Sequence, residues 1–334
     1  MVNGVLVDQD WAPIDILMRR STDNGATWDA PRVIVDHRTF ESMGVTHEGG
    51  HSTINNFTTI ADRSGAVHAL FCVNYARCYH MRSLDDGVSF SEVVDITHAF
   101  EALRAKYDWN VIAVGPGHGI QLSGGRLIAS VWLSTGGKHH RPSAVASIVS
   151  DDGGASWQCG DIVGLHGGEF INPSETVLAE LSDGRVYFNI RSESVRHRRL
   201  VSISPNGTSK WTSPVFDDAL IDPVCMGSII RVSGDRPRIV FACPAPHDLS
   251  QQWYGCLYER ENLTLYMSSD DCRTWGAKRT LEKGYAGYSD LAYTNDGHIL
   301  CFYECDRVDG RLADDRYCTL ARFSPEWIDG TNDV

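Results

Sequence analysis

The sequence of 334 residues predicts an all-β protein, a six-bladed β-propeller that occupies residues 1–334 as one domain. Two observations predict this fold: a short motif recurs along the chain, and strand-like runs separate its copies. The motif reads S-x-D-x-G-x-[ST]-aromatic, which suits a hairpin turn because Asp hydrogen-bonds back to the backbone and Gly adopts a positive φ. Four copies lie at residues 21–28, 83–90, 150–157 and 268–275, with Cys272 at the glycine position of the last, and a looser copy lies at residues 204–211.

The spacing of the motif indicates a repeated structural unit. The closing aromatics stand at positions 28, 90, 157, 211 and 275, and these intervals suit one four-stranded propeller blade each. Runs rich in β-branched and aromatic residues, such as 66–72, 185–190 and 298–303, lie outside the copies, and turn dipeptides such as Asp183-Gly184 and Asp296-Gly297 separate the runs. Six blades fit if one blade is incomplete or lacks its motif. Residues 99–107 are the one stretch whose pattern predicts a helix, and we expect this helix to lie between two strands, outside the sheets.

The formal net charge of −13 and a pI near 5.4 argue against two classes of partner. An acidic protein repels nucleic acid and anionic membranes, so we expect neither as a partner. An anionic ligand must instead be held by a local cluster of arginines. No apolar run is long enough to span a bilayer, the N-terminus has no signal-peptide pattern, and we expect no cofactor.

The ten cysteines favour neither disulfide bonds nor a metal site. None forms a C-x-x-C pair. The closest two, Cys301 and Cys305, lie in and just after an apolar run, where thiols often serve as small core residues. We therefore expect most of the cysteines to be free and buried. They do not indicate in which cellular compartment the protein functions.

The segments between the motif copies carry an ordered set of further motifs. In chain order they are residues 115–128, residues 172–191 with Glu175 and Arg191, the R-E-N-L-T-L segment from Arg260, the Y-S-D-L segment from Tyr288, and the F-Y-E segment that ends at Glu304. The recurring S-x-D-x-G-x-[ST]-aromatic motif is known as the Asp-box. Together with it, this ordered set resembles the motifs of the sialidases. The resemblance runs from about Asp10 to the C-terminus, and the order of the motifs is much more specific than any one of them.

The resemblance implies a retaining exo-α-sialidase that acts on sialylated glycoconjugates. Sialic acid carries a carboxylate on its anomeric carbon, so a carboxylate nucleophile would approach against like charge, whereas a tyrosine would not. Tyr288 is the implied nucleophile, and Glu175 is the implied base for its phenol, whose ordinary pKa is about 10. Arg191 and Arg260 would bind the substrate carboxylate through planar, charge-assisted hydrogen bonds.

Sialidases also need an acid that protonates the departing oxygen, and the resemblance places it on a loop before the first Asp-box. Asp10 has the family's distance from Ser21, whereas Asp15 looks like the start of a strand. Asp8 is the alternative. We prefer Asp10 because of its separation from the Asp-box.

One departure from the family concerns a third arginine. Sialidases bind the carboxylate with three arginines, and the first belongs to an F/Y-R-I-P strand before the acid loop. This sequence begins Met1-Val-Asn-Gly and contains no such strand. Glu304, which would orient that arginine, is present. We therefore expect that the N-terminal part of the first blade is missing, and that residues 1–334 alone bind weakly and dissolve poorly.

Two short strings match motifs of other chemistries. Residues 47–51 read H-E-x-x-H, which binds zinc when both histidines share one face of a helix, but the two central glycines would cost that helix about 2 kcal/mol. We therefore expect a loop and no metal. Residues 115–119 read G-P-G-H-G, and because residues 120–122 suit a strand rather than a helix, we expect a loop that lines the sugar pocket rather than a phosphate site.

Two other functions are compatible with these residues. A non-catalytic Asp-box propeller would bind glycans without Tyr288, Glu175 or an acidic loop, so their joint presence favours the enzyme. A trans-sialidase would share the same core residues and differ in how it binds the acceptor. The substrate class favours a secreted or periplasmic protein, while linkage preference and oligomeric state stay open.

Overall fold

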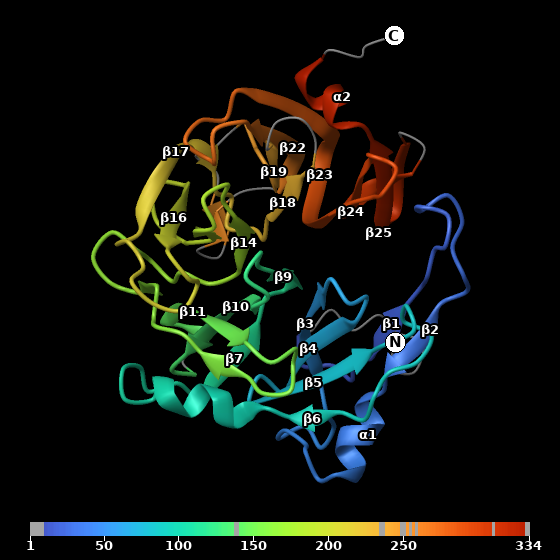
Figure 1. Cartoon of the computed structure of the whole chain (residues 1–334), viewed down its shortest axis with the longest axis vertical. Coiled ribbons are helices and arrows are strands. Elements are labelled where there is room, and N and C mark those ends of the chain that lie inside the picture. The colour runs from blue at the N-terminus through green and yellow to red at the C-terminus, as the bar shows by residue number, and fades with distance from the viewer. Residues whose placement is uncertain are drawn as a thin grey trace.

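The structure is a computed structural model that describes residues 10–136, 140–233, 238–247, 252–253, 256–257, 260–308 and 311–330 of the chain. In this part of the chain, sheets stand around a central axis as in a β-propeller (Figure 1). The colours of Figure 1 follow the chain once around the axis, from the N-terminal hairpin to the last sheet. The prediction of an all-β fold is therefore confirmed.

The first half of the chain forms a hairpin and two larger sheets. The hairpin pairs β1 (Ile16–Met18) with β2 (Arg32–Val35), and α1 (His37–Ser42) follows it. The next sheet has the order β6-β5-β4-β3-β8 and contains β3 (Ile54–Ala61), β4 (Val67–Val73), β5 (Arg77–Ser83), β6 (Val94–Asp95) and β8 (Gly117–His118). The third sheet contains β7 (Val111–Val114), β9 (Ile120–Gln121), β10 (Leu127–Ser134), β11 (Ser143–Ser150), β12 (Gln158–Cys159) and β13 (Gly164–Leu165).

The second half of the chain forms two larger sheets and a small one. The first has the order β14-β15-β16-β17 and contains β14 (Thr176–Glu180), β15 (Val186–Ile190), β16 (Arg198–Ser204) and β17 (Val215–Ile221). The second contains β18 (Ser228–Val232), β19 (Arg238–Pro244), β22 (Glu261–Ser268), β23 (Ala277–Tyr293), β24 (Ile299–Val308) and β25 (Arg311–Phe323). The short strands β20 (Gln252–Trp253) and β21 (Cys256–Leu257) pair with each other, and α2 (Pro325–Asp329) follows β25.

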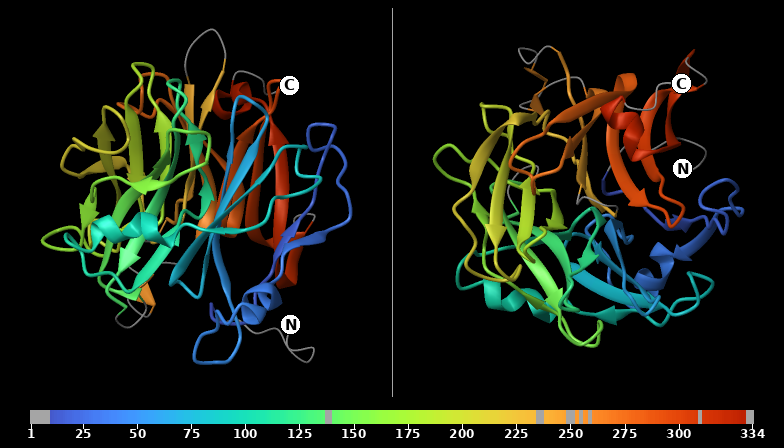
Figure 2. Two further views of the ribbon diagram at one scale, coloured as in Figure 1. Left: turned by 60° about the horizontal axis from the view of Figure 1, so that its bottom comes forward. Right: turned by 45° about the horizontal axis from the view of Figure 1, so that its top comes forward.

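The prediction of six blades is not met by the described residues, which form four sheets of four or more strands. One reason is β23, a strand of 17 residues. Its first half pairs with β22 and its second half with β24, so two groups of strands merge into one sheet. The other reason is that β1 and β2 form a two-stranded sheet. The loop of this hairpin lies beside the last sheet (Figure 2), where a Cβ on Gly25 would stand 3.2 Å from Leu300 of β24.

The Asp-box forms the same turn in each of its four main copies, and in the last of them Cys272 stands in place of the glycine with a φ of 61°. In the first copy Ser21 Oγ accepts a hydrogen bond from Gly25 N at 2.8 Å, and Asp23 accepts from Thr27 N at 2.9 Å and Thr27 Oγ1 at 2.6 Å. Equivalent hydrogen bonds surround Asp85, Asp152 and Asp270. The motif thus closes a hairpin, as its residues predict.

The core lies between neighbouring sheets. One buried cluster combines Leu70 and Cys72 of β4 with Leu127 and Leu133 of β10. The predicted helical stretch is a 3₁₀ helix, η1 (Thr97–Leu103), which packs on this cluster through buried side chains. Among the described residues, no helix is long and apolar enough to cross a membrane. Among the residues with described side chains, nine cysteines form no disulfide bond and seven of these nine are buried, which agrees with the prediction.

Candidate active site

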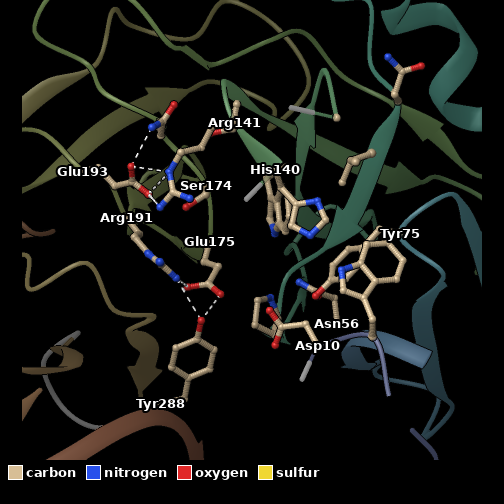
Figure 3. A pocket seen from close by; sticks show the side chains of 18 of the residues that line it. Asp10, Asn56, Tyr75, His140, Arg141, Ser174, Glu175, Arg191, Glu193 and Tyr288 are labelled. Carbon is tan, nitrogen blue, oxygen red and sulfur yellow. Dashed lines mark hydrogen bonds and ion pairs between the residues drawn. The ribbon is translucent and has the colours of Figure 1, made fainter. Parts of the chain in front are cut away.

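A cavity of 1240 Å³ contains four of the six predicted site residues (Figure 3). Asp10, Glu175, Arg191 and Tyr288 line it, whereas Arg260 and Glu304 contact Tyr288 from outside the lining. Sites for small ligands usually enclose about 300 to 1,000 Å³. The cavity therefore leaves room beside a single sugar residue.

Strand register places Glu175 and Arg191 opposite each other. β14 and β15 pair antiparallel with Thr176 opposite Ile190, and the next residue outward on each strand is the glutamate or the arginine. Arg191 N still donates to Glu175 O, at 3.0 Å, so the pairing continues one residue beyond the strands. Both side chains consequently leave the same end of one hairpin and point into the cavity (Figure 3).

Tyr288 reaches the same point from a distant part of the chain. It lies on β23, where the register with β24 shifts between Ala286 and Ser289, and its N–H donates to Glu304 Oε2 at 3.1 Å. A Cβ on Gly287 would stand only 2.0 Å from Glu304 Oε2, so a glycine is required for this approach. Glu304 therefore fixes the backbone of Tyr288.

Tyr288, Glu175 and Arg191 form one hydrogen-bonded group. Tyr288 Oη donates to Glu175 Oε1, while Arg191 Nη1 donates to Glu175 Oε2 and, at 3.0 Å, to Tyr288 Oη. Burial raises the pKa of Tyr288 well above its ordinary value, and the charge of Glu175 raises it further against the opposing effect of the arginines. The phenol is therefore protonated at rest, and Glu175 stands where a base must stand to remove its proton.

The two arginines beside Tyr288 both keep their charge. Burial is the largest single influence on the pKa of Arg191 and would lower it. The charges of Glu175 and Tyr288 and the hydrogen bond to Glu175 together outweigh burial, so the pKa lies well above its ordinary value. Burial would also lower the pKa of Arg260, yet neighbouring acidic groups, with Cys225 first, raise it. Arg260 Cζ lies 5.1 Å from the centre of the Tyr288 ring. Within the described residues Arg191 Nε is buried without a hydrogen-bond partner, which leaves it able to donate to an anion in the cavity.

Asp10 faces the cavity from the side across from Tyr288 (Figure 3). It precedes β1 on a segment without regular secondary structure. Asp15 serves elsewhere, because its Oδ1 accepts from His37 N at 2.8 Å and lies 2.7 Å from His37 Nδ1, at the start of α1. Asp8 lies outside the described residues. Of the candidate acids that the structure describes, Asp10 is the one that lines the cavity.

Two groups of cavity residues were missed by the sequence interpretation. Arg141 Nε donates to both carboxylate oxygens of Glu193, at 2.9 and 2.8 Å, and Asn172 Nδ2 donates to Glu193 Oε2 at 2.7 Å. Glu193 stands two residues after Arg191, and this alternation was an available signal. The other group is an aromatic wall of Trp11, Tyr75, Trp132 and His140, whose rings contact one another. These four positions share no motif, so the sequence offered no signal for them.

The two strings that match other chemistries have structural roles. Residues 47–51 form a loop, as predicted, in which Gly49 N donates to His47 Nδ1 at 2.8 Å. Within the described residues, the group of three possible metal ligands lies elsewhere, at Asp15, Asp36 and His37. Residues 115–119 are not wholly a loop as predicted, because Gly117–His118 form the short strand β8 beside β3. The strand β9 follows them, as predicted, and Pro116 lines the cavity.

Comparison with known proteins places the chain in a family. The model of the BNR repeat-like domain matches residues 9–301. A sialidase of Micromonospora viridifaciens is 28% identical over 87% of this chain, and sialidase-3 of Bos taurus is 28% identical over 80% of it. The chain spans 45% of the length of the first relative and 76% of the second.

Solved structures agree on the fold. A Hadza microbial sialidase superposes with a TM-score of 0.77 at 22% identity, and covers 96% of this chain and 61% of its own. The intramolecular trans-sialidase from Ruminococcus gnavus superposes with a TM-score of 0.72 at 14% identity, over 94% of this chain and 88% of its own. With the family match over most of its length, the chain belongs to the sialidase family with BNR repeat-like domains.

Proposed function

We propose that the protein is a retaining exo-α-sialidase that releases terminal sialic acids from glycoconjugates. The observation that carries the proposal is the hydrogen bond from Tyr288 Oη to Glu175 Oε1, made in a cavity that Asp10 faces from the other side. A neutral phenol can approach an anomeric carbon that bears a carboxylate without charge repulsion. Glu175 then takes the phenolic proton as the Tyr288–carbon bond forms and the glycosidic bond breaks.

Asp10 is proposed as the acid and base of the two steps. It gives a proton to the departing glycosidic oxygen in the first step, and takes one from water in the second, when water displaces the sugar from Tyr288. Two inversions at the anomeric carbon leave the configuration retained. Arg191 and Arg260 stay charged in this environment, and we propose that both bind the substrate carboxylate.

Three measurements test this function. The protein should release fluorophore from a 4-methylumbelliferyl α-sialoside, and NMR should find the α-anomer of sialic acid as the first product. A fluorinated sialosyl fluoride should label the protein, and peptide mass spectrometry should find the label on Tyr288. Label on another residue, or the β-anomer as first product, would contradict the proposed mechanism.

A trans-sialidase is the second candidate, because intramolecular trans-sialidases superpose on this chain with TM-scores of 0.72. Such an enzyme would form the same intermediate and release it to a hydroxyl of the sugar itself rather than to water. Mass spectrometry separates the two products, since the anhydro sugar is lighter than free sialic acid by one water. A protein that binds sialosides without turnover would instead be a glycan-binding propeller.

A further inference from the structure

The acid loop, residues 10–13, is held by one short segment, residues 51–55. Three successive backbone carbonyls of the loop meet three side chains of the segment: Asp10 O accepts from Asn55 Nδ2 at 3.3 Å, Trp11 O lies 2.7 Å from His51 Nε2, and Ala12 O accepts from Thr53 Oγ1 at 2.8 Å. A carbonyl oxygen can only accept, so His51 Nε2 must carry a proton and donate it. The loop is thus bound through its backbone.

The alternation of an extended chain explains why one segment can make all three contacts. Successive side chains of such a chain point to opposite sides, so residues 51, 53 and 55 share the side that faces the loop. The intervening Ser52 and Ile54 are buried on the other side. Ile54 begins β3, and Thr53 forms a parallel bridge with Ile14. The segment is therefore a fixed extension of a sheet.

Packing fixes the loop only in part: the Trp11 ring contacts the rings of His47, Tyr75 and His140, but Trp11 also has open space on two sides. Its indole lines the cavity of 1240 Å³ and also a second cavity of 650 Å³, bounded mainly by residues 44–48 and 73–77. Trp11 is 38% exposed. It meets the His47 ring edge-on at 5.5 Å between centres, and His47 in turn contacts His51 at 4.2 Å. A shift of Trp11 would carry the neighbouring Asp10 with it.

We propose that His51 is a positioning residue that holds Asp10 at the place where it can protonate the leaving group. The proposal rests on the proposed function, in which Asp10 is the acid. The bond from His51 Nε2 to the Trp11 carbonyl acts on the peptide next to Asp10, and it is the shortest of the three contacts. Without it the loop keeps two hydrogen bonds but gains freedom towards the second cavity.

The test uses two substitutions at His51 and one control. His51→Phe keeps a ring against His47 but cannot donate, whereas His51→Gln restores an N–H at a similar reach. His98→Ala changes an exposed histidine on η1 and serves as the control. We expect His51→Phe to lower kcat/KM roughly three- to tenfold on sialyllactose, which needs the acid, and less than about twofold on the aryl sialoside. His51→Gln should recover most of the loss.

A second measurement separates the positioning role from the proposed function. Hydrogen–deuterium exchange of residues 10–16 should rise in His51→Phe and remain at the parent level in His51→Gln and His98→Ala. Equal losses on both substrates, or unchanged exchange in His51→Phe, would overturn the positioning role. A parent protein that releases sialic acid from neither substrate would refute the proposed function and the catalytic part of this proposal, while exchange would still show whether His51 holds the loop.

Discussion

The two sides of the cavity are built in different ways. On one side, Tyr288 lies on a strand, and Glu175 and Arg191 directly adjoin paired strands. Their functional atoms are hydrogen-bonded to one another. On the other side, Asp10 lies on a loop whose contacts with residues 51–55 are made through backbone carbonyls. The first side fixes the reacting atoms, and the second fixes only the backbone that carries them.

The support beneath the two sides differs as well. Next to Arg191 lies the fully buried ion pair of Arg199 and Asp222, with Nη1 and Oδ1 3.4 Å apart, and Asp222 also accepts from Ser192 N at 2.7 Å. The sheet on the acid side instead contains a pair of buried histidines, His68 and His80, with ring nitrogens 3.2 Å apart. An ion pair and a pair of buried imidazoles respond differently to acid.

This difference matches the chemistry that each side is proposed to perform. A tyrosine nucleophile needs a base and a positive charge at fixed positions, because its ordinary pKa of about 10 makes it a poor nucleophile without them. A group that protonates an oxygen and later deprotonates water must meet two different partners. A carboxylate with no hydrogen bond fixing it to the nucleophile group suits that second task.

The largest effect is expected from removing the hydroxyl of Tyr288. Tyr288→Phe leaves the strand and the contact with Glu304 intact but removes the hydroxyl of the proposed nucleophile, so kcat for the aryl sialoside should fall by about 10³-fold or more. Tyr293→Phe is the matched control on the same strand, because its hydroxyl donates to Ser233 O away from the cavity. Equal activity of the two variants would show that Tyr288 is not the nucleophile.

A smaller, substrate-dependent effect is expected from the loop side. Asp10→Ala should lower kcat/KM on sialyllactose by about 10²-fold or more, and on the activated aryl sialoside by much less, because only a poor leaving group needs the proton. Asp29→Ala, at an exposed position after the first Asp-box, is the control. Similar losses on both substrates would assign Asp10 a structural role instead.

Arg191 should contribute mainly to binding of the substrate carboxylate. Arg191→Lys keeps the charge but cannot bridge Glu175 and Tyr288 while also offering Nε, so kcat/KM should fall by roughly ten- to a hundredfold. Arg126→Lys, which alters a surface pair with Asp151, should have little effect. An unchanged KM for the sialoside together with a reduced kcat would contradict a role in carboxylate binding, and would indicate that Arg191 acts on Tyr288 alone.

The sequence predicted the strand-borne side better than it predicted the rest. Glu175 and Arg191 flank a hairpin whose Asp-Gly turn fixes the register, so their proximity follows from local pattern alone. Asp10 was inferred from its distance to one turn, and nothing in its neighbourhood predicted the contacts with residues 51–55. The number of blades was mispredicted because β23 continues through two groups of strands, which a count of turns cannot detect.

The smallest effect is expected on stability in acid. It distinguishes the buried histidine pair, His68 and His80, from the buried ion pair of Arg199 and Asp222. Burial lowers the pKa of His80 from 6.5 to about 4. At a pH between these two pKa values, His80 binds more protons in the unfolded chain than in the folded one. The free energy of unfolding is therefore undiminished by His80 above the unfolded pKa, and it declines as the pH falls towards 4. We expect a loss of roughly 1 kcal/mol between pH 7 and pH 5.5.

His80→Gln tests this, because glutamine can still donate to His68 Nδ1 but does not titrate. Thermal melting at pH 7 and pH 5.5 should show a smaller shift for His80→Gln than for the parent. Hydrogen exchange, corrected for its intrinsic pH dependence, should rise at pH 5.5 in β4 and β5 of the parent before it rises in β15 and β16. If β15 and β16 opened first, the buried ion pair would be the acid-sensitive support, and the nucleophile side rather than the acid side would limit stability at low pH.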